Sequence, residues 1–246
     1  MRKLPLLLTL IPIASASIMM SSALWALEGD CECQCAPAKN TSVRQDKVLQ
    51  PNAIREQSNA QQIKLQELKQ KWAYSKYHVK STAQQAAYKN AILAAEELTT
   101  LYPDMAEAWV WQGIIKASDA SRKKGIAALM AVKSAKADLE KGLEMGPKNS
   151  LSFGQAVLGA IYHKVPGRPV GFKDKKKAEN FLLKAMATDE TNINANYFYA
   201  EFLIHQKRKE EAKPYLEKVM AAPTRTTYKI ADEGRKAEAR ALLKTI

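Results

Sequence analysis

The chain has 246 residues, of which 46% are hydrophobic and 26% charged, so it can bury a core and is not a disordered polymer. Only 10 residues are glycine, and several stretches are rich in alanine and lysine, which argues against an all-β sandwich. The formal net charge of +13 favours anionic partners. Nucleic acid is not expected among them, because no recognition motif accompanies the charge.

The N-terminus has the layout of an export signal. Arg2 and Lys3 precede an uncharged apolar stretch, and small residues such as Ala16 and Ala23 offer sites to a signal peptidase. We therefore expect residues 1–26 to be removed and the remaining chain to lie in the periplasm. An uncleaved segment would be long enough to anchor the chain in the inner membrane as a helix.

The three cysteines, Cys31, Cys33 and Cys35, form one cluster in residues 27–62, a polar segment that we interpret as a flexible tether. Alternate side chains of an extended segment point the same way, so the thiols could converge on a soft metal ion. Three ligands are one short of a tetrahedral zinc shell, however. In an oxidising compartment the odd count could instead link two chains into a disulfide-bonded dimer. We favour a cluster without metal, and no lipidation, because Asp30 stands where a lipoprotein signal needs a small residue.

Residues 63–246 are predicted to form one all-α domain, because apolar residues recur at helical spacing and almost no run alternates with the period of a strand. Small and large residues follow a tetratricopeptide-like pattern, in which small residues let two antiparallel helices approach and large ones fill the gaps. The pattern predicts a superhelix of about four irregular hairpins, closed by a capping helix over roughly residues 228–244. Insertions are expected around 118–127 and 163–177. A generic helical bundle that matches by chance is the alternative. The pattern positions are Ala91, Ala95 and Pro103, then Trp109, Gly113, Ala135, Leu139, Gly142 and Pro147, then Gly159, Tyr162, Ala178, Leu182 and Ala185, and finally Ala200, Ala212, Leu216, Val219 and Pro223.

The C-terminal part, roughly residues 105–246, resembles a known family. The resemblance is carried by the PGRP sequence at 166–169, the NYFYAE sequence at 196–201, and Asp232 and Arg235. In these residues the chain is similar to the T-component family associated with TRAP transporters. The resemblance implies a periplasmic tetratricopeptide-like protein that assists solute uptake, with a hydrophobic concavity or pore as the ligand path and a transporter subunit as a partner.

One connection in the domain is strongly basic. Between Lys164 and Lys177 there are six cationic side chains and a single acid, Asp174. Such a patch attracts an anionic envelope component or an acidic envelope protein, unless it is a solvated loop without a partner. Phe172 can anchor the loop to the helices. The candidate binding residues of this loop are Arg168, Phe172, Lys175, Lys176 and Lys177.

A second candidate surface lies on the helix that carries the aromatic run Tyr197, Phe198 and Tyr199. Aromatic side chains on two faces of one helix are typical of packing between neighbouring repeats. The functional alternative is that this helix lines the concave face and contacts a ligand. Its candidate residues are Asn194, Asn196, Tyr197 and Tyr199.

The sequence contains no arrangement that predicts an enzyme. We find no Ser-His-acid spacing, nucleotide loop or paired catalytic carboxylates, and no cofactor is expected. His78, His163 and His205 are too far apart in sequence to argue for a metal site. The preferred hypothesis is a non-enzymatic periplasmic scaffold that binds a protein or peptide through its helical surface. The alternative is an accessory solute- or ligand-binding protein of a TRAP-type transporter.

Overall fold

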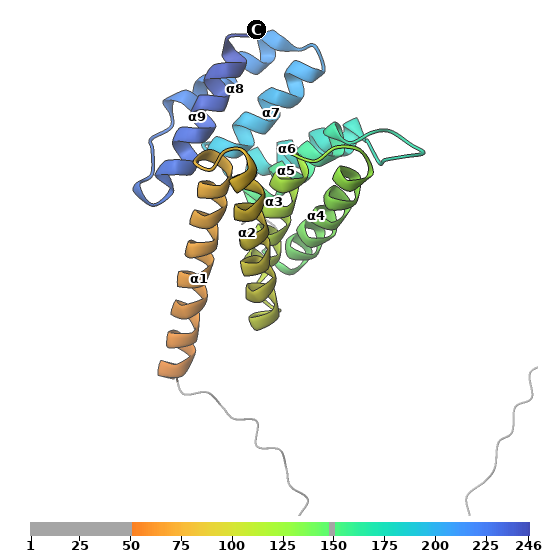
Figure 1. Ribbon diagram of the computed structural model, residues 1–246. Coiled ribbons are helices and arrows are strands. Elements are labelled where there is room, and N and C mark those ends of the chain that lie inside the picture. Colours follow the sequence, from red (N-terminus) through yellow and green to blue (C-terminus); the bar gives the residue numbers. More distant parts are fainter. Residues whose placement is uncertain (1–50, 148–150) are drawn as a thin grey trace, which may run out of the picture. The chain divides into compact units, whose positions relative to one another are not determined.

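A computed structural model describes residues 51–147 and 151–246, and in this part of the chain all regular structure is helical (Figure 1). The predicted signal segment, the cysteine cluster and most of the predicted tether lie outside the described residues. The helices are α1 (Pro51–Tyr77), α2 (Thr82–Leu101), α3 (Ala106–Ala120), α4 (Gly125–Met145), α5 (Ser152–Lys164), α6 (Lys175–Thr188), α7 (Ile193–His205), α8 (Lys209–Ala221) and α9 (Lys229–Leu243), with a short 3-10 turn at Thr226–Tyr228 before α9.

Consecutive helices pack in pairs, α1 with α2, α3 with α4, α5 with α6 and α7 with α8, which confirms the predicted all-α helical-hairpin fold. Small residues lie where the two helices of a hairpin touch. A Cβ on Gly113 would lie 2.6 Å from Leu139 Cγ, and one on Gly142 would lie 2.7 Å from Val110 Cγ2. The hairpins therefore approach so closely that some contact positions admit no side chain at all.

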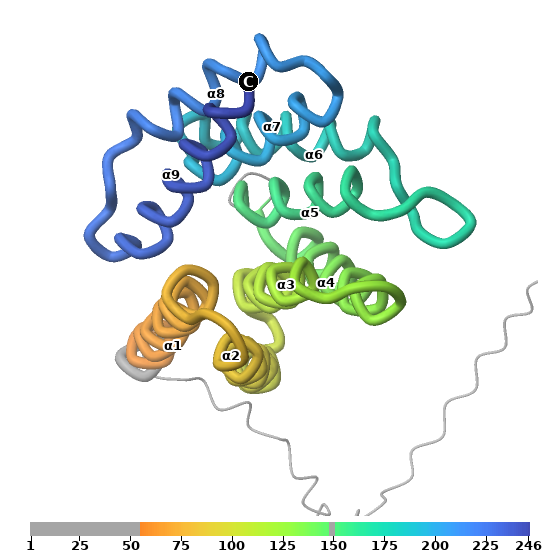
Figure 2. The backbone as a smooth tube through the Cα atoms, turned by 45° about the horizontal axis from the view of Figure 1, so that its top comes forward, coloured from red at the N-terminus to blue at the C-terminus, as the bar shows by residue number. Residues whose placement is uncertain are grey.

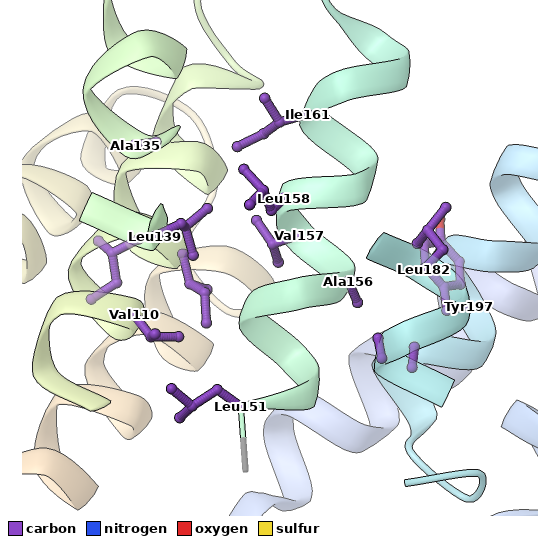
Figure 3. Packing of buried hydrophobic residues seen from close by; sticks show 14 of the residues in the cluster. Val110, Ala135, Leu139, Leu151, Ala156, Val157, Leu158, Ile161, Leu182 and Tyr197 are labelled. Atoms are coloured by element: carbon purple, nitrogen blue, oxygen red, sulfur yellow. The ribbon is translucent and has the colours of Figure 1, made fainter. Parts of the chain in front are cut away.

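Helix α5 is the interior helix of the domain, because its sequence carries no charge before its last turn. Every residue from 154 to 163 is buried. Figure 3 shows Val157, Leu158 and Ile161 pointing from α5 toward Leu139 of α4, whereas Ala156 lies on the other side, toward α6. The helix thus joins the first two hairpins to the last two in one continuous core.

The C-terminal helix does more than cap the stack: α9 packs against α8 and also against α1, which closes the superhelix into a ring (Figure 2). The Tyr77 hydroxyl donates to Glu238 Oε2 at 3.3 Å, and the Tyr228 hydroxyl donates to Gln66 Oε1 at 3.1 Å. Gly234 lies directly on the Tyr77 ring, because a Cβ there would be 2.3 Å from Cδ1. The inner sides of the hairpins therefore face one another across a shared interior.

The predicted insertions differ in form. Residues 121–124 alone connect α3 and α4, so the first insertion lengthens the two helices instead of forming a long loop. The second is an ordered loop over 165–174. Its Phe172 packs edge-to-face on Tyr162 with ring centroids 5.7 Å apart, and Asp174 caps α6. These contacts hold the loop in place beside the closed ring of helices.

The first helix begins at Pro51, inside the segment 27–62 interpreted as a flexible tether, so residues 51–62 are helical and belong to α1. Within the described ranges, none of the helices has both the length and the apolar character that crossing a membrane requires.

Candidate ligand-binding groove

A groove with a volume of about 680 Å³ lies on the inner side of the ring, between α1, α3, α4, α5, α7 and α9. Most of its wall is apolar, and the apolar side chains come mainly from α4, α5 and the loop after α5. Ring closure creates this groove, since α1 and α9 supply the side opposite α4. The large apolar residues of its wall are Trp72, Ile126, Leu129, Val132, Phe153, Val157, Ile161, Val165, Val170 and Phe198.

One end of the groove carries a charged cluster centred on Arg235, whose side chain is only 2% exposed. Its Nε donates to Asn194 Oδ1 at 3.0 Å, and its Nη1 donates to the Glu238 carboxylate. The guanidinium carbon also lies 4.4 Å from the ring centroid of Tyr197 and 4.7 Å from that of Phe198. Burial is tolerated because a carboxylate, an amide oxygen and two aromatic rings replace the lost water.

Two lysines complete the cluster. Lys76 Nζ pairs with Glu238 Oε1 at 3.1 Å, and Lys164 Nζ pairs with Glu201 Oε2 at 2.6 Å. When Lys76 is protonated, three cations meet two carboxylates, which leaves one excess positive charge at this end of the groove. Burial, reinforced by the neighbouring Arg235 charge, lowers the pKa of Lys76 to about 7, whereas Glu238 opposes this shift. A negatively charged ligand group placed here would return Lys76 to its charged form.

The lowered pKa of Lys76 predicts that the free energy of unfolding rises with pH above neutrality. In the unfolded chain this amine keeps its proton up to about pH 10.5, whereas in the folded protein it loses the proton near pH 7, so unfolding takes up a proton between these values. From pH 7 to about pH 9 we expect Lys76 to contribute a gain on the order of 1–2 kcal/mol.

Urea unfolding at both pH values measures this gain in the wild type and in Lys76→Met. General changes in net charge affect the two proteins alike, so the difference between their gains reports Lys76. An equal gain in both proteins would contradict the assignment.

Of the four candidates on α7, one lines the groove and a second contacts Arg235 at its charged end. Tyr197 lines it and stacks on Arg235, and Asn194 accepts the hydrogen bond from the same guanidinium. Asn196 is instead buried, and its Nδ2 donates to the backbone oxygen of Asn192 at 2.9 Å. Tyr199 packs edge-to-face on Tyr215 of α8, with centroids 4.9 Å apart. Asn196 and Tyr199 therefore support the fold of α7 and do not line the groove.

The basic loop borders the groove, but its candidate cations are not among the residues that line it. Arg168 and the three lysines 175–177 are exposed. Phe172 anchors the loop through Tyr162, as expected. The loop residues that line the groove are Val165, Pro166 and Val170, together with Lys164 at the end of α5.

Sequence reasoning missed Lys76 and Glu238 as members of the site, and it named Arg235 only through the family resemblance. Lys76 is one of several lysines along α1, so its spacing carries no distinguishing signal. The one available signal was the polar residue Arg235 at a position where the helical pattern of α9 requires a buried side chain.

No metal centre emerges in the described ranges, where no group of three or more His, Cys, Asp or Glu side chains converges. Folding does bring His163 and His205 together, with ring centroids 5.0 Å apart. Burial lowers the pKa of His163 to about 3, so this imidazole is neutral and belongs to the core. The cysteine candidates lie outside the described residues.

Comparison with protein-family models yields no match for this chain, and a search of curated proteins finds no relative.

Proposed function

We propose that this chain is a non-enzymatic binding protein whose groove holds an amphipathic carboxylate. The apolar part of the ligand lies along α4 and α5, and its carboxylate lies beside Lys76 and Lys164. The observation that carries the proposal is the excess positive charge at one end of an otherwise apolar groove. Apolar walls with a few convergent polar groups are typical of small-ligand sites.

The groove favours a ligand-binding protein over the scaffold that the sequence analysis placed first. Its volume of about 680 Å³ falls within the roughly 300–1,000 Å³ of small-molecule pockets. Closure of the ring also leaves the inner surface bounded by helices on several sides, whereas a scaffold needs an open concave face. An apolar peptide that ends in a free carboxylate offers the same chemistry and is one outcome of the test below.

Calorimetric titration of the full chain with dodecanoate tests the proposal. We expect saturable binding that weakens about fourfold for each methylene removed, because each buried methylene contributes about 0.8 kcal/mol. Dodecanol, which has the same chain but no charge, should bind about tenfold more weakly or worse. Equal affinity for dodecanol and dodecanoate would contradict the role of the charged cluster.

Two variants separate the cluster from general charge effects. Lys76→Gln combined with Lys164→Gln should weaken dodecanoate binding about tenfold while leaving dodecanol binding unchanged. The matched control is Lys213→Gln combined with Lys218→Gln, which removes the same charge from α8, outside the groove. If a short apolar peptide with a free C-terminus binds more tightly than dodecanoate, the scaffold hypothesis is the better description.

Export to the periplasm and a TRAP-type transporter partner remain part of this proposal. They rest on the N-terminal layout and on the resemblance of residues 105–246. A periplasmic accessory protein that holds an anionic apolar solute would suit such a transporter, and co-purification with a transporter subunit would support the partnership.

A further inference from the structure

The mouth of the groove is bordered by exposed apolar side chains that stand at the start of α4 and on the loop between α5 and α6. Ile126 is 78% exposed and Met130 is 68% exposed, one turn apart on the same face of α4. Val170, on the loop between α5 and α6, is 63% exposed. Both Ile126 and Val170 line the groove, so the start of α4 and the α5–α6 loop lie at the same end of the ring of helices. Figures 1 and 2 show the α3–α4 turn and the α5–α6 loop on the same side of the domain.

The same two segments are dense in positive charge. We define the rim as residues 121–133 and 164–177. Together they contain ten lysines and arginines and one acid, Asp174, whose carboxylate is engaged in capping α6. Lys123, Lys124, Arg168 and Lys173 are exposed beside the apolar side chains. Acids outside the rim neutralise part of this charge, since Asp119 pairs with Arg122 and Lys123, and Glu201 pairs with Lys164. The rim still carries an excess of positive charge beside its protruding apolar residues.

We propose that the rim docks on an anionic lipid bilayer, with Ile126, Met130 and Val170 inserted among the headgroups and the surrounding cations on the lipid phosphates. Interfacial binding of this kind grows with buried apolar area and with attraction to anionic lipid. This proposal goes beyond the ligand-binding function and does not depend on it.

The shape of the rim favours a bilayer over an acidic protein. Its apolar side chains stand on a helix start and a loop tip, not on one continuous face. A stable protein interface needs about 800 Å² of complementary surface on each partner, whereas separate apolar tips can each enter a fluid headgroup layer. The position of the rim also places the mouth of the groove against the membrane surface.

Vesicle co-sedimentation of the full chain tests the proposal. We compare vesicles of phosphatidylcholine alone with vesicles that also contain phosphatidylglycerol. Partition should favour the anionic vesicles, and it should fall about fivefold for each rim lysine replaced by glutamine. Ile126→Asp combined with Val170→Asp should reduce partition about tenfold or more. The matched control, Ile63→Asp combined with Leu93→Asp, changes the charge equally at positions on α1 and α2 that are 60% and 54% exposed.

Hydrogen exchange of the wild-type chain supplies a measurement that needs no variant. Adding anionic vesicles should slow amide exchange within the rim. Four results would overturn the proposal: no partition at all, equal loss in rim and control variants, equal partition into neutral and anionic vesicles, or protection confined to residues 1–50. Binding to polyglutamate without binding to vesicles would also overturn it and would indicate an acidic protein partner.

Discussion

Gly159→Leu should unfold the domain or destabilise it by about 3 kcal/mol, because the close approach of α5 and α6 has no room for a side chain. A Cβ at this position would already lie 2.7 Å from Leu182 Cγ and 2.9 Å from the carbonyl oxygen of Ala178. Leu182 is fully buried, and the carbonyl belongs to the α6 backbone, so neither can move without shifting the helix. The midpoint of urea unfolding measures the effect.

Gly167→Leu is the matched control, since a Cβ there meets no atom within 4 Å. Its free energy of unfolding should stay within about 0.5 kcal/mol of the wild-type value, as is usual for surface changes. A Gly159→Leu protein that is as stable as the control would show that the hairpin packing is assigned wrongly.

Arg235→Met should cost about 3 kcal/mol of stability and weaken the contact between α9 and α1. The substitution keeps most of the side-chain volume but removes the charge that Glu238 and Asn194 share. It also removes the cation that lies over the Tyr197 and Phe198 rings. The loss is large because it leaves buried polar atoms without the guanidinium, and not because ion pairs are strong in themselves.

Urea unfolding measures the loss, and Arg240→Met serves as the control because it removes the same charge from an exposed position of α9. Hydrogen exchange gives a second readout: amides of α1 near Tyr77 should exchange faster in Arg235→Met and not in Arg240→Met. Equal stability of the two variants would contradict the central position of Arg235.

The hairpins were predictable from sequence because their contacts are local. Small residues such as Gly113 and Gly159 lie in the first helix of a hairpin, and small and large residues alternate at helical spacing in the second, so the pattern within each helix indicates which positions touch. The same local logic located the final helix and placed Phe172 as the anchor of the basic loop.

Ring closure was not predictable in the same way. It depends on the summed rotation of four hairpins, and its contacts join residues far apart in sequence, such as Tyr77 and Glu238. The groove could not be predicted from the sequence for the same reason, since its charged end combines Lys76 of α1 with Arg235 of α9. Sequence could single out Tyr197 and Asn194 on one helix, but not the cations that fold against them.

The most direct measurement is a crystal structure of the protein with bound dodecanoate. The proposed function predicts that the carboxylate lies within hydrogen-bond distance of Lys76 or Lys164 Nζ, and that the alkyl chain runs along Leu129, Val157 and Ile161. A chain bound on the outer surface of the ring, or a carboxylate that points away from the charged cluster into solvent, would contradict it.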